Sequence, residues 1–257
     1  MIRPLGLLLF AAFAWGQRPS DADSAALLEK SRQKALDYAQ SLPDFLCSEI
    51  IERYAAPAED GVKTGGWMHT DTLTVKLSYS QRTESHKLEL VNGKRTDRKF
   101  EELEGATNSG EFGGILRTVF DPGSQAAFDW DSAKTVSGRR IAVYQYAVSA
   151  ANSPYYLRNN SRKGIVGLHG TVEVDAETGE AWRLTFIAYD IPKQLEVQSS
   201  SSTVEYALAN VAGRNYLLPA RSETEMHSSE MWARNKMEFR GYRKFSADSV
   251  IDFGTGK

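Results

Sequence analysis

Apolar positions in the first part of the chain recur with the period of a helix face. Within residues 20–42 they are separated by three, seven and four residues. They are Ala25, Leu28, Ala35, Ala39 and Leu42. Ser20 and the acidic residues after it offer capping groups, and Pro43 cannot continue a helix. The pattern predicts one N-terminal amphipathic helix of about five turns.

From Phe45 onward the period changes to two, which is the period of a strand with one buried and one wet face. Turn residues separate these runs at Asn92-Gly93, at 175–180 and at 212–215. Residues 110–120 return to helical spacing and predict a short internal helix. The fold class is therefore mainly β (α+β), with a curved antiparallel sheet or half-open β-barrel behind an N-terminal helix.

Large apolar side chains are frequent on the predicted strands, and two helices can cover only part of so broad a sheet. The sheet must curl on itself, form two layers, or leave an apolar concavity for a ligand, and a fully packed core is the alternative. The face expected to line such a concavity carries Val172, Val174, Trp182, Leu184 and Phe186. These five are the candidate ligand-binding residues.

The N-terminus has the layout of a secretory signal peptide. Arg3 precedes a ten-residue apolar run at 5–14, which is half the length of a membrane-spanning helix, and small residues follow at Ala14 and Gly16. We expect residues 1–16 to be a cleaved signal and residues 17–257 to form a single domain, with an uncleaved anchor as the alternative. The protein would then be exported, to the periplasm or beyond the cell.

Composition narrows the class of partner. The chain has 31 basic and 33 acidic residues and a net charge of −2, which argues against nucleic acid. Cys47 is the single cysteine, so no disulfide can form within the chain, and its apolar neighbours indicate a buried thiol. We expect no cofactor.

Motifs for chemistry are weak. The sequence lacks a Gly-x-Ser-x-Gly nucleophile motif and a Walker-type phosphate loop. His69 and Asp71 would share a strand face, where a metal would still need a third ligand, so no metal site is predicted. Glu223 and Glu225 also share a predicted face and are the only candidates for a hydrolase. Such pairs are common on solvated strands, so no catalytic residue is assigned.

Several segments nevertheless resemble a known family. They are the strand at 171–175, its turn with the pattern Asp-x-x-Thr-Gly-Glu, and the strand pair at 204–218. Together with the helix and the exported N-terminus, they resemble the outer-membrane lipoprotein-sorting proteins of the bacterial periplasm. Residues 42–47 also resemble the start of a group of exported bacterial proteins of unassigned role.

The resemblance implies a half-open barrel closed by helices, a cavity for acyl chains and no chemistry. We therefore expect a non-enzymatic periplasmic carrier or sensor that binds a lipid or an acylated lipoprotein. A cell-envelope protein-interaction module with a packed core is the first alternative, with another envelope protein as partner. A hydrolase of envelope polymers is the second.

Overall fold

The structure is a computed structural model that describes residues 18–100, 103, 112–159 and 162–245. The expected signal peptide at 1–16 and the start of the internal helical segment lie outside this range. Among the described residues, no helix combines the length and the apolar character needed to cross a membrane.

The N-terminal helix α1 spans Asp21–Ser41. The side chain of Ser20 caps it by accepting a hydrogen bond of 3.1 Å from the backbone N–H of Asp23. The backbone is extended again at Leu42, because Pro43 follows. The helix predicted from the spacing is thus confirmed. The internal helix α2 spans Gly114–Phe120 and is followed by a short 3₁₀ turn, η2, at Pro122–Ser124. A second such turn, η3, spans Lys193–Leu195.

The rest of the described chain is almost entirely strand. The bounds are β1 (Phe45–Glu59), β2 (Val62–Lys63), β3 (Met68–Ser80), β4 (Thr83–Val91), β5 (Lys94–Arg95), β6 (Ala127–Val136), β7 (Arg139–Val148), β8 (Tyr156–Asn159), β9 (Arg162–Ile165), β10 (Gly167–Asp175), β11 (Ala181–Tyr189), β12 (Ser199–Val211), β13 (Arg214–His227) and β14 (Met231–Lys244).

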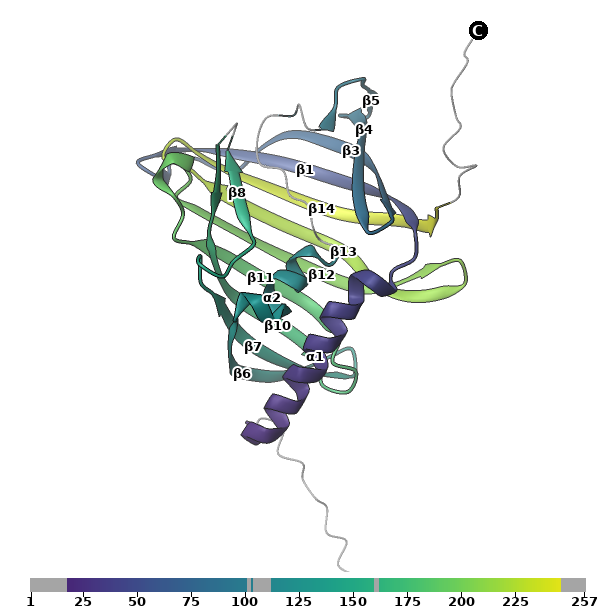
Figure 1. Ribbon diagram of the computed structural model, residues 1–257. Helices are drawn as coiled ribbons and strands as arrows, with labels where there is room; N and C mark the ends of the chain where they lie inside the picture. Colours follow the sequence, from purple (N-terminus) through teal and green to yellow (C-terminus); the bar gives the residue numbers. More distant parts are fainter. Residues whose placement is uncertain (1–17, 101–102, 104–111, 160–161, 246–257) are drawn as a thin grey trace, which may run out of the picture.

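One large sheet contains all of these strands except β8 and β9, which form a separate hairpin. Its order is β5-β4-β3-β1-β14-β13-β12-β11-β10-β7-β6, with β2 paired to β1, and every pairing is antiparallel. The sheet is curved and not closed into a barrel, so the half-open architecture expected from the sequence is confirmed (Figure 1).

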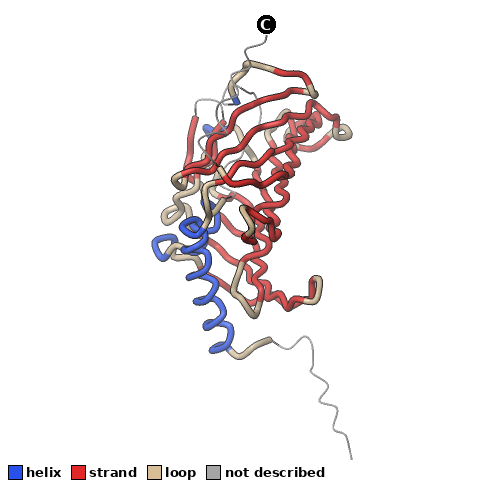
Figure 2. The backbone as a smooth tube through the Cα atoms, turned by 90° about the vertical axis from the view of Figure 1, so that its right-hand side faces the viewer, coloured by secondary structure: helices blue, strands red, loops and turns tan. Residues whose placement is uncertain are grey.

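Both helices lie on the same side of this sheet, which we call the inner face; the opposite side is the outer face. The side view shows α1 running along one side of the curved strands (Figure 2). Two clusters of buried apolar residues lie on the inner face. The helix-covered cluster joins β7, β10, β11 and β12 to α2 and to Ala35 of α1. The second, which we call the β1–β3 cluster, joins β1, β3 and β14 to Phe112.

The tight turns follow the local sequence signals. At Asn92-Gly93 both residues have positive φ, 51° and 73°, and connect the paired residues Val91 and Lys94. Asn and Gly tolerate this left-handed conformation at low cost. Asp175 begins the turn between β10 and β11, where its carboxylate accepts hydrogen bonds from the backbone N–H groups of Glu177 and Thr178 at 2.8 and 2.9 Å. The hairpins predicted at these places are confirmed.

Candidate functional site

The candidate cavity residues lie in the helix-covered cluster. Val172, Val174 and Leu184 are 0 % exposed and Phe186 is 2 % exposed, and all four belong to that cluster. Their strands place them on one face, as the alternation predicts. They are packed against other residues and do not line an open concavity in this structure.

Trp182 differs from the other four because the pairing of β10 with β11 shifts register between Glu173 and Val174. Val174 pairs with Ala181, so Trp182 falls in the irregularity. The ring is partly buried against the cluster, and the guanidinium of Arg139 lies 4.4 Å from its centroid. A strict alternation places Trp182 on the same face as Leu184, but it does not allow for the one-residue irregularity at Trp182.

The cover provided by α1 fits the inner face imperfectly. Ala35 is its one apolar residue in the fully buried set of the described chain, while Leu27, Leu28 and Tyr38 are partly buried. The hydroxyl oxygens of Ser31 and Tyr38 are buried without a hydrogen-bond partner. Burial raises the pKa of Tyr38 well above its usual value. An unpartnered buried hydroxyl costs about 1–3 kcal/mol, so these two contacts weaken the attachment of α1.

The β1–β3 cluster is closed from above by Phe112, whose ring centroid lies 5.1 Å from that of Phe45 and 5.5 Å from that of Phe239. Cys47 lies in this cluster and is 2 % exposed, which confirms the buried thiol expected from its neighbours. Burial and the nearby Glu49 raise the pKa of the thiol to about 12. A thiol with this pKa is protonated at neutral pH and is not a nucleophile.

A row of polar side chains crosses the inner face on five adjacent strands. Direct cross-strand pairs join Ser202 of β12 to Thr224 of β13, Thr224 to Asn235 of β14, Asn235 to Arg53 of β1, and Arg53 to Asp71 of β3. We call these five residues the polar row. Ser202, Thr224 and Asn235 are 4–6 % exposed. The side chains of Arg53 and Asp71 are 14 % and 13 % exposed.

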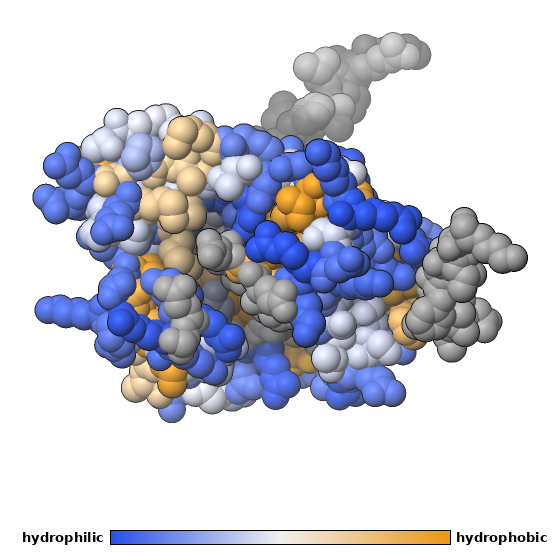
Figure 3. Space-filling model, turned by 90° about the horizontal axis from the view of Figure 1, so that it is seen from above, coloured by the Kyte–Doolittle hydropathy of each residue, from blue (hydrophilic) through white to orange (hydrophobic). Residues whose placement is uncertain are grey.

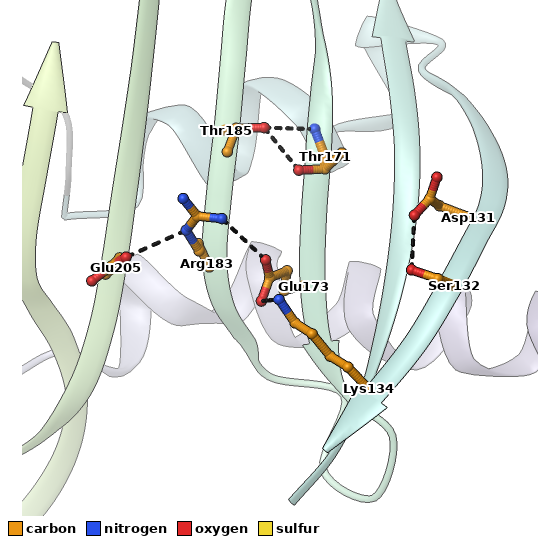
Figure 4. A network of polar contacts seen from close by, with 8 residues as sticks. All are labelled: Asp131, Ser132, Lys134, Thr171, Glu173, Arg183, Thr185 and Glu205. Atoms are coloured by element: carbon orange, nitrogen blue, oxygen red, sulfur yellow. Dashed lines mark hydrogen bonds and ion pairs between the residues drawn. The ribbon is translucent and has the colours of Figure 1, made fainter. Parts of the chain in front are cut away.

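The outer face carries charged side chains in cross-strand networks (Figure 4). Glu173 is bound by Lys134 at 2.7 Å and by Arg183 at 3.3 Å, and Arg183 also lies 3.4 Å from Glu205. These residues alternate with Val172 and Leu184 along the strands, so they point away from the helices. Viewed from above, the molecule presents hydrophilic residues with apolar patches between them (Figure 3).

The outer face also has an open hollow of about 520 Å³, lined in part by Arg183, Glu205, Arg221 and Lys236. A second hollow of about 590 Å³ lies beside residues 188–198. None of the five candidate cavity residues lines either hollow. Neither of these two hollows is therefore the predicted apolar site.

The hydrolase candidates Glu223 and Glu225 line the first hollow, and both are bound by Arg234. Arg234 lies 3.4 Å from the carboxylate of Glu223 and donates from Nε to that of Glu225 at 2.6 Å. The arrangement resembles the surrounding ion pairs.

His69 and Asp71 do not share a face. The register of β1 against β3 shifts between Arg53 and Tyr54, so Asp71 pairs with Arg53 on the inner face and His69 pairs with Tyr54 on the outer face. The simple alternation missed this irregularity. No group of three metal-ligating side chains occurs among the described residues.

Sequence reasoning did not identify the polar row as a feature. Its members are far apart in the chain, and each looks like an ordinary strand residue. The sequence signal for this row is a polar residue at a position where the alternation predicts an apolar one. Asn235, two residues before Met237 on the same strand face, is an example. Recognising the row from such residues also requires knowing which strands are neighbours in the sheet.

No protein-family profile matches this chain, and no curated protein is detectably similar in sequence. Among solved structures, the chain is similar to a LolA superfamily protein from Nitrosomonas europaea, with 10% identity, a TM-score of 0.41 and coverage of 88% of this chain and 96% of that one. The expected resemblance to lipoprotein-sorting proteins is confirmed at the level of structural neighbours.

Two further neighbours have similar values. A DUF1329 family protein from Desulfovibrio piger matches with 8% identity, a TM-score of 0.40 and coverage of 90% of this chain and 94% of that one. A putative outer membrane lipoprotein-sorting protein domain from Vibrio parahaemolyticus matches with 11% identity, a TM-score of 0.37 and coverage of 86% and 92%. These likenesses concern the course of the chain alone.

Proposed function

We propose that this protein is a non-enzymatic, exported carrier or sensor that holds an acyl chain between the inner face of its sheet and α1. Residues 1–16 would direct its export as a signal peptide, with the periplasm as the compartment. The acyl chain would belong to a lipid or to an acylated lipoprotein. Val172, Val174, Trp182, Leu184 and Phe186 would form the surface that it contacts.

The observation that carries this proposal is the mismatch between the inner face and its cover. The sheet presents many fully buried apolar side chains. From α1 come one fully buried apolar residue, Ala35, the partly buried Leu27 and Leu28, and two buried hydroxyls without hydrogen-bond partners. In a core that never opens, such unpartnered hydroxyls lower the stability of the folded protein. An acyl chain would contact the same apolar surface without that cost. Displacement of α1 by the ligand is therefore less expensive than opening a well-packed core.

The first test is mass spectrometry of protein purified under mild conditions, combined with titration of a fluorescent C16 acyl probe. We expect a co-purified lipid and saturable binding. Absence of both would contradict the proposal.

A pair of leucine variants then locates the site. Leu184→Ala removes contacts from the helix-covered cluster and should weaken probe binding about tenfold, which is about 1.4 kcal/mol. Leu208→Ala makes the same change at a residue that is 51% exposed and should leave binding unchanged. Circular dichroism and urea unfolding of both variants separate a loss of binding from a loss of fold. Equal binding by the two folded variants would remove the inner face as the site.

The protein-interaction alternative is favoured by the close burial of Val172, Val174, Leu184 and Phe186 in this structure. It predicts no lipid in the purified protein and no probe binding, so the same titration separates the two functions. For the hydrolase alternative, Glu223→Gln and Glu225→Gln are the decisive variants. Any hydrolysis of envelope polymers that survives both changes would exclude these two residues as its catalytic acids.

A further inference from the structure

The polar row crosses a face that buries mostly apolar side chains, where Glu49, Ser200 and Ser222 are further buried polar residues. The next position along the strands pairs Leu184 with Val204 on β11 and β12, and Met237 with Ile51 on β14 and β1. All four are buried. On β13, between Val204 and Met237, this row holds Ser222, a buried polar residue. Apart from Ser222, an apolar row thus runs beside the polar row across the same strands. Polar groups in a buried place cost free energy unless they are hydrogen-bonded.

The polar row also has a defined end. Ser202 pairs with Phe186 on β11, and from there the same row continues through Gly170 to Tyr146 on β7. Aromatic side chains thus follow the polar ones within one row. The row changes from aromatic to polar side chains between β11 and β12, beside the candidate cavity residues Leu184 and Phe186. A ligand lying there would meet apolar groups on one side and polar groups on the other.

The polar row is electrically neutral. Arg53 and Asp71 form a two-point pair, with Nε to Oδ1 at 2.6 Å and Nη2 to Oδ2 at 2.5 Å, so their charges cancel. The hydroxyls of Ser202 and Thr224 are 2.8 Å apart, and either can donate. Asn235 adds an amide, which both donates and accepts. Arg53, Thr224 and Asn235 take part in further interactions, so a ligand here would exchange hydrogen bonds with groups that already have them.

We propose that the polar row receives the uncharged polar part of an acyl ligand, namely the ester and hydroxyl groups of an acylglycerol, while its chain lies along the apolar row. This inference rests on the proposed function and names its ligand class. Adjacent strands are about 4.8 Å apart, so Ser202, Thr224 and Asn235 span about 10 Å, the scale of a glycerol ester. A phosphate would bring negative charge to a place where the one cation, Arg53, is already neutralised.

The experiment measures displacement of the fluorescent acyl probe by three ligands with a C12 chain, the two amphiphiles below the concentration at which they aggregate and the hydrocarbon below its solubility limit. They are 1-monolauroylglycerol, 1-lauroyl lysophosphatidic acid and dodecane. We expect 1-monolauroylglycerol to displace the probe at a concentration about tenfold lower than either of the others, which corresponds to one or two additional hydrogen bonds.

Two double variants test the row itself. Ser202→Ala with Thr224→Val removes two inner-face hydroxyls and should weaken binding of 1-monolauroylglycerol about tenfold while changing dodecane binding less than about twofold. Ser201→Ala with Thr203→Val makes the same kinds of change on β12, where Thr203 pairs with Thr185 of the outer face. This control should bind all three ligands like the unchanged protein.

The outcomes separate this inference from the proposed function. If the three ligands bind equally, or if the lysophosphatidic acid binds best, the ligand class is wrong while the acyl carrier stands. If none of them binds and the probe does not bind, the proposed function fails and takes the inference with it. If the inner-face double variant does not fold, the ligand preference of the unchanged protein decides the matter alone.

Discussion

The hydroxyl of Tyr146 on β7 donates a hydrogen bond of 2.9 Å to the backbone carbonyl oxygen of Thr185 on β11, across the intervening strand β10. The residue paired with Tyr146 on that strand is Gly170. The backbone N–H of Thr171 bonds to the side-chain oxygen of Thr185 at 2.9 Å. The ladder between β10 and β11 is therefore completed locally by two side chains.

Removing the hydroxyl from Tyr146 should destabilise the protein. In Tyr146→Phe the carbonyl oxygen of Thr185 loses this donor in a partly buried place, and we expect a loss of about 1 kcal/mol in the free energy of unfolding, measured with urea. Tyr38→Phe is the matched control, because the hydroxyl of Tyr38 is buried without a partner. Tyr38→Phe should leave the free energy of unfolding unchanged or raise it by at most about 1 kcal/mol. A larger loss in Tyr38→Phe than in Tyr146→Phe would contradict this account.

Gly170 should tolerate no side chain. A Cβ at this position would lie 2.1 Å from the carbonyl oxygen of Thr185, the acceptor that Tyr146 uses. Because this contact is with backbone, we expect Gly170→Ala to reduce the free energy of unfolding by more than about 2 kcal/mol. Gly66→Ala adds the same methyl group in open space and should stay within about 0.5 kcal/mol of the unchanged protein. Thermal or urea unfolding of the two variants compares them directly.

Asp175 should make stability depend on pH in acid. Burial alone would raise the pKa of Asp175, but the backbone N–H groups of Thr178 and Glu177, together with Arg139, outweigh burial and hold the pKa below its usual value. The lowered pKa contributes stability that is present above the unfolded-state pKa of about 3.9 and is lost as the pH falls through the folded-state value.

We therefore expect Asp175→Ala to cost about 2 kcal/mol at pH 7 and less at pH 3. Urea unfolding at the two pH values measures this difference. Asp131→Ala is a control at an exposed carboxylate and should cost less at pH 7. A cost for Asp175→Ala that is the same at both pH values would show that its charge is unimportant.

Cys47 should make stability depend on pH in alkali. The folded thiol has a pKa of about 12, whereas an unfolded one ionises near 8.5, so the unfolded state loses its proton first. Stability should fall by up to about 1.4 kcal/mol per pH unit above about pH 8.5. Cys47→Ala should remove this slope between about pH 8.5 and 10, below the range where tyrosines add their own effect. In native protein at pH 8, a thiol reagent should leave Cys47 unmodified until urea is added.

Much of the fold follows from local signals. The capping of α1 by Ser20, the end of the helix before Pro43 and the hairpin at Asn92-Gly93 depend on residues close together in the chain. The separate hairpin of β8 and β9 is not among the predicted elements, because its two four-residue strands carry no clear alternation of apolar and polar positions.

The site was less accessible from sequence. Alternation grouped Val172, Val174, Leu184 and Phe186 correctly on one face, but it gave no measure of how closely the helices would cover them. Register irregularities are also invisible in a pattern of period two, as the separation of His69 from Asp71 illustrates. The polar row depends on the pairing of residues as far apart in the chain as Arg53 and Asn235.

The unclosed sheet has a mechanical consequence. Its outermost strands, β5 and β6, belong to one continuous ladder but are not bonded to each other. A closed barrel fixes its radius through the shear of its strands, whereas an open sheet can flatten or tighten by a few degrees of twist at each strand pair. Ten such pairs lie between β5 and β6, so small rotations add up across the molecule. If an acyl chain binds between α1 and the strands as proposed, such rotations would let the sheet adjust to chains of different bulk without breaking a cross-strand hydrogen bond.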